Sequence, residues 1–335
     1  MAHRRATFVG VVLVLLVALV ISAACRTFCV ELYTVAPQQM ENTLLPGDRV
    51  LVEKWHYGVR LPQSILSLPG VDSLPGCNVP AYIPARPLPY KRLWLDEVGR
   101  NDVIVYNYPM GEAKPLSKYP TAMARCIGVP GDVVEARDGA LYINGEPSAQ
   151  SPVATAAYLV ADSVLLQVEK AMQQLGDEPL ARQRVGSNNT LFYLDRYRYN
   201  RLCEILPSTC RPTPVLLSQD NYVVELPQYD QEVAITPDNA AFYADIINRY
   251  EPKKVDCVGD ALYRGGRKIA TYRFTQPYYW VVCDNRTSAT DSRTFGVLPH
   301  SHVIGRCGMI VFSIDARLTG FSSWRTQRFF KSGNL

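Results

Sequence analysis

The hydrophobic pattern of the chain begins with an uninterrupted apolar run. Residues 8–24 carry no charge and consist mainly of Val, Leu, Ala and Ile. A membrane-spanning helix needs about 17–25 such residues, and its backbone polar groups must be satisfied within the helix. Arg4 and Arg5 precede the run. The positive-inside rule therefore predicts that these arginines stay in the cytoplasm and that the chain after Arg26 lies across the membrane.

A cleaved signal peptide is the alternative explanation of this run. Ser22, Ala23 and Ala24 are small enough for cleavage, and Cys25 resembles a lipid-attachment site. The run is long for a signal sequence, however. We therefore expect residues 1–30 to form an uncleaved anchor of a single-pass protein in the cytoplasmic (inner) membrane, with the bulk of the chain on the extracytoplasmic side.

After the anchor, short apolar and β-branched runs alternate with turn residues, which predicts strands. A proline-dense stretch at 61–89 has little periodicity and predicts a long extended loop. The predicted strands and hairpin arms lie at 50–55, 102–108, 123–127, 138–145, 278–283 and 308–313.

The middle of the chain has a different pattern. Residues 161–175 have helical apolar spacing, and a second helix is predicted at 237–250, with Thr236 as its cap and Pro237 at its first position. A hairpin is expected around Gly265-Gly266. The sequence thus predicts a mainly β protein in which an inserted α+β domain interrupts a β-rich body. The expected boundaries are 31–146 and 276–335 for the body and 147–275 for the insertion.

Charge and cysteine content narrow the function classes. A net charge of +4 over 335 residues gives no reason to expect a nucleic-acid partner. The nine cysteines show no spacing that indicates zinc, so we expect no metal and no cofactor. Outside the cytosol some cysteines could form disulfides, and Cys203 with Cys210 is the best local candidate pair. The other explanation is that several cysteines are small buried hydrophobes.

Four segments carry the chemical information. Residues 37–48 read Pro-Gln-Gln-Met-Glu-Asn-Thr-Leu-Leu-Pro-Gly-Asp, and they lead into a Val-Leu-Val-Glu-Lys strand. Residues 100–106 read Arg-Asn-Asp-Val-Ile-Val-Tyr, and 125–132 read Arg-Cys-Ile-Gly-Val-Pro-Gly-Asp. Residues 284–296 contain Asp-Asn-Arg and then Asp-Ser-Arg before a glycine. In type, order and approximate spacing these segments resemble the bacterial type I signal peptidase family.

The resemblance implies a β-rich catalytic body beside the membrane and a serine/lysine mechanism. In that family a serine attacks the peptide bond after the signal sequence, and a neutral lysine accepts its proton. Burial in an apolar site can lower the pKa of a lysine enough for this role. Hydroxyl and backbone N–H donors then stabilise the oxyanion.

The residues that would carry this mechanism are missing. The nucleophile position holds Gln39 and the general-base position holds Ala124, so neither the alcohol nor the amine is present. Pro37 replaces the side chain that offers a hydroxyl to the oxyanion, and Ala289 replaces the serine that orients the lysine. Asn42 replaces a proline of the nucleophile segment.

A shifted alignment does not restore the pair. Placing the nucleophile at Thr34 or Thr43 breaks the register with Met40 and Leu44. Lys114 and Lys118 lie between prolines in a predicted loop, and Arg125 cannot lose its proton. Ser288 neighbours Ala289, but no lysine remains for it to orient.

The resemblance assigns the remaining motif residues to structure and to substrate contact. Buried opposite charges normally pair because a lone one is strongly destabilising. Solvated turn residues are the alternative explanation. Met40 and Leu44 would line a substrate cleft that accepts an extended peptide by strand addition, or they would simply be core residues. The expected structural network comprises Arg125, Asp284, Arg286, Asp291, Ser292 and Arg293.

Three hypotheses follow for the function. The first is a membrane-anchored, catalytically inactive homologue (a pseudopeptidase) that binds preproteins, signal peptides or an active paralogue. The second is an active signal peptidase that uses other groups. The third is a structural subunit of an envelope complex. A C-terminal stretch of mixed aromatics and cations at 324–331 fits contact with membrane lipid or an exposed tail.

Overall fold

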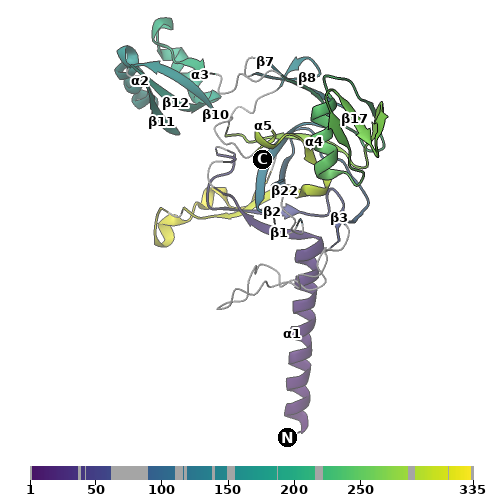
Figure 1. Ribbon diagram of the computed structural model, residues 1–335. Coiled ribbons are helices and arrows are strands. Elements are labelled where there is room, and N and C mark those ends of the chain that lie inside the picture. Colours follow the sequence, from purple (N-terminus) through teal and green to yellow (C-terminus); the bar gives the residue numbers. More distant parts are fainter. Residues whose placement is uncertain are drawn as a thin grey trace.

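Figure 1 shows a computed structural model of the chain, with a long N-terminal helix that extends away from a mostly β body. The structure describes residues 2–36, 39–41, 43–61, 90–109, 116, 119–137, 140–148, 155–186, 188–215, 222–285, 291–315 and 317–332. Most of the predicted proline-rich loop at 61–89 lies outside the described residues.

The N-terminal apolar run forms helix α1 (Ala2–Phe28), as the sequence predicts. Its segment Gly10–Phe28 has a mean hydropathy of 2.5, and none of it is buried against the rest of the protein. By length and composition, α1 can therefore cross a membrane. The chain turns at Cys29 directly into the first strand of the body.

The body is built on one antiparallel sheet with strand order β1-β2-β22-β5-β6-β20-β21, and β23 pairs with the far part of β22. The strand predictions within the body are confirmed to within a few residues, except that β22 begins five residues earlier than expected. The strands are β1 (Val30–Thr34), β2 (Asp48–Glu53), β5 (Val103–Asn107), β6 (Thr121–Gly128), β20 (Tyr278–Val282), β21 (Leu298–Pro299), β22 (Val303–Ser313) and β23 (Lys331–Ser332).

Both faces of the central strands are buried, which explains why β5 is a continuous apolar run rather than an alternating one. We call the two packed groups the Tyr57 cluster and the Met40 cluster. The Tyr57 cluster contains Tyr57, Val98, Ile104, Tyr106, Ala122, Ala124, Cys126, Tyr279, Val281, Cys283, Leu298 and Val303. The Met40 cluster contains Val35, Met40, Leu44, Val50, Val52, Val103, Val105, Met123, Ile304, Cys307 and Ile310.

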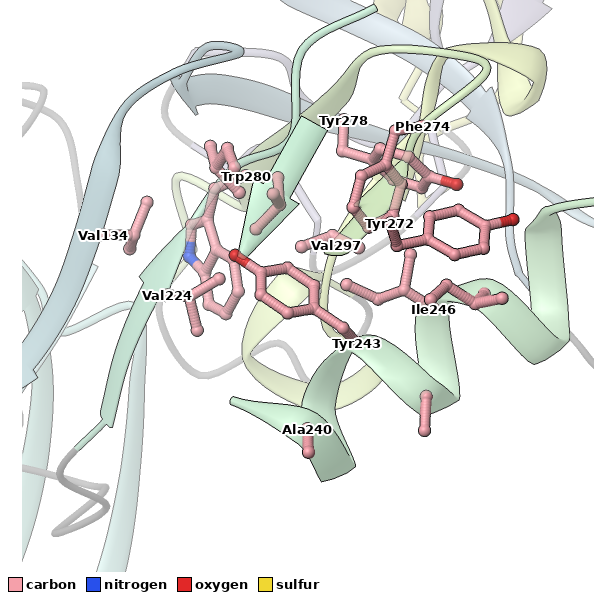
Figure 2. Packing of buried hydrophobic residues seen from close by; sticks show 14 of the residues in the cluster. Val134, Val224, Ala240, Tyr243, Ile246, Tyr272, Phe274, Tyr278, Trp280 and Val297 are labelled. Atoms are coloured by element: carbon pink, nitrogen blue, oxygen red, sulfur yellow. The ribbon is translucent and has the colours of Figure 1, made fainter. Parts of the chain in front are cut away.

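A third core lies where α4 (Ala240–Tyr250) packs against aromatic side chains (Figure 2). The sequence prediction that this helix begins at Pro237 was wrong. Asn239 is the N-cap position, and its side chain accepts a bond from the Thr236 N–H, which holds a turn before the helix. Around it lie β7 (Val133–Arg137), β8 (Ala140–Ile143), β9 (Glu146–Pro147), β14 (Tyr222–Glu225), β15 (Glu232–Ala234), β16 (Asp256–Val258), β17 (Ala261–Arg264), β18 (Arg267–Ile269) and β19 (Thr271–Arg273).

The expected Gly265-Gly266 hairpin is confirmed, since β17 and β18 pair directly around those glycines. The domain boundaries at 147 and 275 stay a prediction, and one ladder crosses the first of them. Strand β14, inside the expected insertion, pairs with β7, which lies before it.

A separate four-stranded sheet carries two helices and its own core. Helix α2 (Asp162–Leu175) is as predicted and ends at Gly176, which has the left-handed φ of 68°. Cys203 and Cys210, the candidate disulfide pair, are both free thiols in this structure, and the Cys210 Sγ donates to the Gln167 Oε1 at 2.8 Å. Elements that the sequence did not predict are β10 (Thr155–Ala161), β11 (Ala181–Val185), β12 (Asn189–Asp195), α3 (Arg196–Ile205) and β13 (Thr213–Val215).

A buried ion pair joins the C-terminal segment to the start of β2. The Asp48 side chain has no exposed surface, and its two oxygens accept from Arg328 at 3.2 and 2.6 Å. Arg328 also donates to the Thr43 carbonyl oxygen, and Asp48 accepts the Leu45 N–H. The pair therefore fixes the turn between Thr43 and Asp48 from the far end of the chain.

We predict that Arg328→Gln lowers the free energy of unfolding by about 3–5 kcal/mol, because it leaves the buried Asp48 carboxylate without its cation. Arg317→Gln is the matched control, since Arg317 is 86% exposed in its pair with Asp315. Arg317→Gln should leave the free energy of unfolding unchanged within the error of the measurement. Urea denaturation of the detergent-solubilised chain measures both, and equal losses would contradict the prediction.

Candidate functional site

The segment that resembles the family's nucleophile motif packs against one face of the main sheet. Met40 and Leu44 are fully buried in the Met40 cluster, beside Met123 of β6. The Met40 carbonyl oxygen accepts the N–H groups of Thr43 and Leu44, which closes a tight turn. In this structure both expected substrate-contact residues are core residues.

The Gln39 side chain binds the backbone of β6. Its side-chain Oε1 accepts the Met123 N–H at 3.1 Å, and its carbonyl oxygen accepts the Asn285 N–H at 3.2 Å. β5 pairs with β6 over residues 121–125, whereas β20 pairs only with 125–128. Among the described residues, no strand pairs with the first half of β6 on the β20 side. The Gln39 carboxamide therefore binds a ladder N–H at an otherwise unpaired strand edge.

Ala124 lies beside this contact but contributes to the other face of the sheet. It is fully buried in the Tyr57 cluster, which also holds Tyr106 and Cys283. Burial raises the pKa of Tyr106 well above its ordinary value, so its hydroxyl stays protonated. Ala124, which the sequence resemblance predicts at the general-base position, thus places a methyl group in an apolar environment.

A carboxylate connects the strand, the nucleophile-like segment and the late motif. Arg125 donates to both oxygens of Asp284, from Nε at 3.0 Å and from Nη2 at 2.7 Å. The Thr43 hydroxyl donates to the Asp284 Oδ2 at 2.6 Å. The side chains of Arg125 and Asp284 are only 12% and 4% exposed. Charge-assisted bidentate contacts of this kind are strong and fix the relative position of the two side chains.

A second pair organises the turn after β20. Asp291 is fully buried, caps the short helix α5 (Ser292–Phe295), and binds Arg293 at 2.7 Å. Burial alone would lower the pKa of Arg293, but the bonds to Asp291 raise it above its ordinary value. The Asp291 Oδ2 also accepts the Cys283 N–H, and the Ser292 hydroxyl accepts the Val281 N–H. These bonds hold the turn against the end of β20.

Several residues named from the sequence lie outside the described residues. They are Pro37, Asn42, Lys114, Lys118, Arg286, Ser288 and Ala289.

Within the described part of the chain, the site has no hydroxyl paired with an amine. The Thr43 hydroxyl, the closest candidate in sequence, donates to a carboxylate that Arg125 already neutralises. Thr34 lies at the end of β1, opposite Arg49 of β2. The described residues also contain no cluster of three or more His, Cys, Asp or Glu that fits a metal.

Three contacts of the site were not found by sequence reasoning. They are the bonds from Gln39 to Met123, from Thr43 to Asp284, and from the Asn285 amide to Glu41 at 3.0 Å. Each joins residues more than 80 positions apart. The only available signal was that the two motif segments occur together.

We predict strong coupling between Arg125 and Asp284. Arg125→Met and Asp284→Asn should each lower the free energy of unfolding by about 3–5 kcal/mol, because each leaves a poorly solvated charge. The double variant should lose at least about 1 kcal/mol less than the sum. Arg273 and Asp230, at 59% and 66% exposed, form the control pair, and the losses from their two single substitutions should add within the error of the measurement. Additive losses at Arg125 and Asp284 would contradict this prediction.

Comparison with known proteins places this geometry in a family. Residues 8–200 and 229–312 match the family described as "Signal peptidase, peptidase S26". The chain is 31% identical over 175 residues to "Signal peptidase I" of Pseudomonas aeruginosa, covering 52% of the chain and 46% of that protein. It is 22% identical over 320 residues to "Signal peptidase I" of Buchnera aphidicola, covering 95% of the chain and 80% of that protein.

The matched region of the chain spans about half the length of the Pseudomonas aeruginosa protein. The chain is also 32% identical over 126 residues to "Signal peptidase I" of Pseudomonas fluorescens, and this match covers 34% of that protein. The family match nevertheless covers well over half of the chain, including α1, β5, β6 and β20. Together with the mostly β fold and the apolar N-terminal helix, these matches establish that the chain belongs to the bacterial type I signal peptidase family, peptidase S26, and indicate a single-pass membrane protein.

Proposed function

We propose that the protein is a membrane-anchored signal peptidase I homologue that binds preproteins through their signal peptides, or an active paralogue, without cleaving them. Helix α1 anchors it in the cytoplasmic membrane, and the β body lies on the extracytoplasmic side. The family membership supports a role in the processing of signal peptides, and the composition of the site supports the loss of hydrolysis.

The observation that carries the proposal is the local environment of the two catalytic positions. Gln39 uses its side chain to bind a backbone N–H of β6, and Ala124 is a methyl group packed among apolar side chains. A carboxamide cannot replace an alkoxide nucleophile, and a methyl group cannot accept a proton. Removing either partner from a serine hydrolase costs roughly 10⁴–10⁶ in turnover. Loss of both leaves at most weak polarisation of the peptide carbonyl.

The geometry of this site also supports the proposal that the protein still binds peptides. An extended peptide can add to a strand edge through backbone hydrogen bonds. In the described structure, the β20 side of residues 121–124 is such an edge. The Arg125–Asp284 contact holds the end of this edge in a fixed position. The Gln39 carboxamide already accepts the Met123 N–H, and the Cys283 Sγ donates to the Met123 carbonyl oxygen, so an incoming strand must displace both bonds. We therefore expect weak, reversible binding.

Two other functions remain as outcomes of the test. An active signal peptidase would need an unrecognised dyad, for which the sequence offers Thr43, Ser288, Lys114 and Lys118. A structural subunit of an envelope complex would need no peptide contact at Gln39.

We predict that a photo-crosslinking amino acid at position 39 forms an adduct with the signal peptide of a preprotein, and that the adduct retains the uncut preprotein. The same probe at Leu166 is the control, since Leu166 is 63% exposed on α2. Gel analysis and mass spectrometry of the adducts measure both. Equal labelling at the two positions would contradict binding at the site and favour the structural subunit.

Cleavage of the preprotein by the purified unmodified chain would contradict the proposal in a different way. If the cleavage disappears on substitution of Thr43, Ser288, Lys114 or Lys118, that residue belongs to an active dyad and the protein is a peptidase. If it survives all four substitutions, it comes from a contaminating enzyme and the proposal stands.

A further inference from the structure

Two arginines face each other across a short strand pair near the membrane anchor. The strands β3 (Val59–Arg60) and β4 (Arg92–Leu93) are antiparallel, and Arg60 is the direct partner of Arg92. Like charges directly opposite each other in a sheet destabilise it. Such a pair therefore calls for something that offsets the repulsion.

The protein offsets this repulsion with neutral groups only. Arg60 donates to the Asn107 amide oxygen at 2.9 Å. Arg92 donates to the Tyr57 carbonyl oxygen at 2.9 Å, to the Tyr90 hydroxyl at 2.8 Å, and to the Val303 carbonyl oxygen. Among the described residues, neither guanidinium is in an ion pair with a carboxylate.

The other shielded arginines of the body behave differently. Arg125, Arg293 and Arg328 are 12%, 25% and 17% exposed, and each binds a buried aspartate at 2.6–2.7 Å. Within the described part of the chain, the Arg60–Arg92 pair is thus a positive site without a carboxylate partner, unlike these three arginines.

The two histidines next to the pair do not change its charge balance. Arg92 Nη1 lies 2.9 Å from His300 Nε2, and the His300 Nδ1 lies 3.0 Å from the Tyr279 hydroxyl. Burial, and after it the charge of the neighbouring arginines, lowers the pKa of His300 and of His302 to about 3. Both imidazoles are therefore neutral near pH 7. Burial and the charge of Arg92 likewise lower the pKa of Arg60 to about 10, which leaves it protonated.

The Arg60–Arg92 pair lies close to the part of the body that joins the membrane anchor. Glu53 at the end of β2 pairs with Val30, two residues after α1 ends, and Arg60 follows Glu53 by seven residues, in β3. The chain around the pair exposes large apolar side chains that suit a membrane interface. These are Trp55 (53% exposed), Tyr90 (36%), Leu93 (43%), Trp94 (58%) and Leu95 (45%).

From this arrangement we propose that Arg60 and Arg92 form a binding site for the phosphodiester of an anionic membrane phospholipid. Guanidinium groups match phosphate oxygens with paired N–H donors. Among the described residues, Arg60 bonds only to the Asn107 side chain, and it is partly exposed. The bound phosphate supplies the missing negative charge, and the exposed tryptophans contact the lipid beside it. The site would hold the body at a fixed orientation to the bilayer, independently of any peptide binding.

We predict that phosphatidylglycerol, titrated into neutral detergent micelles that hold the purified full chain, raises the thermal unfolding midpoint saturably. Phosphatidylcholine with the same acyl chains should not. Arg60→Gln should raise the phosphatidylglycerol content needed for half saturation at least about tenfold, the factor that corresponds to a loss of about 1.4 kcal/mol. Arg60→Lys keeps the charge and should weaken binding less.

Arg264 and Arg267 provide the matched control, because they too are cross-strand partners but are exposed at a hairpin. The double variant Arg264→Gln, Arg267→Gln should bind phosphatidylglycerol like the unmodified chain. Equal half saturation in Arg60→Gln and the unmodified chain would overturn the proposal. A shift with inorganic phosphate but none with phosphatidylglycerol would overturn the lipid assignment.

A measurement on the unmodified chain covers the case in which Arg60→Gln does not fold. Native mass spectrometry of chain released from micelles with equal amounts of both lipids should show preferential retention of phosphatidylglycerol. Equal retention of the two lipids would overturn the proposal.

Discussion

The contact between Arg125 and Asp284 is the constraint on which the candidate site depends. It joins strand β6 to the segment after β20, 159 residues later, and Asp284 also accepts the hydroxyl of Thr43 from 241 residues earlier. Both charges are shielded from water, so each needs the other. The position of Gln39 at the edge of β6 follows from this contact, since Thr43 and Asn285 hold its segment from both sides.

Under the proposed function, the site keeps its supporting structure and lacks the groups that hydrolysis needs. The ion pairs at Asp284 and Asp291 and the packing of Met40 remain those of an ordered site. The two positions at which protons would move hold groups suited to their present surroundings instead. A carboxamide satisfies the strand N–H of Met123, and the methyl of Ala124 fits an apolar cluster in which a charged amine would be poorly solvated.

The sequence predicted features that depend on local pattern. The apolar runs of β5 and β6 and the apolar spacing of α2 were sufficient to predict these three elements, because each element buries a continuous face. Helix α3 escaped detection, since its sequence is mostly polar and its start depends on Asp195 accepting the Arg198 N–H. Two pairings join residues that are far apart in the sequence. Arg328 and Asp48 are 280 positions apart, and Arg92 and Arg60 are 32 positions apart. No local pattern encodes such distances.

Activity of the single variant Gln39→Ser tests the central claim most directly. This substitution restores the alcohol and frees the Met123 N–H, but the position of the base remains the methyl of Ala124. The account predicts no cleavage of a preprotein by Gln39→Ser, even with enzyme in excess over substrate and long incubation. Cleavage at the end of the signal sequence by this variant would show that another group accepts the serine proton, and would contradict the account.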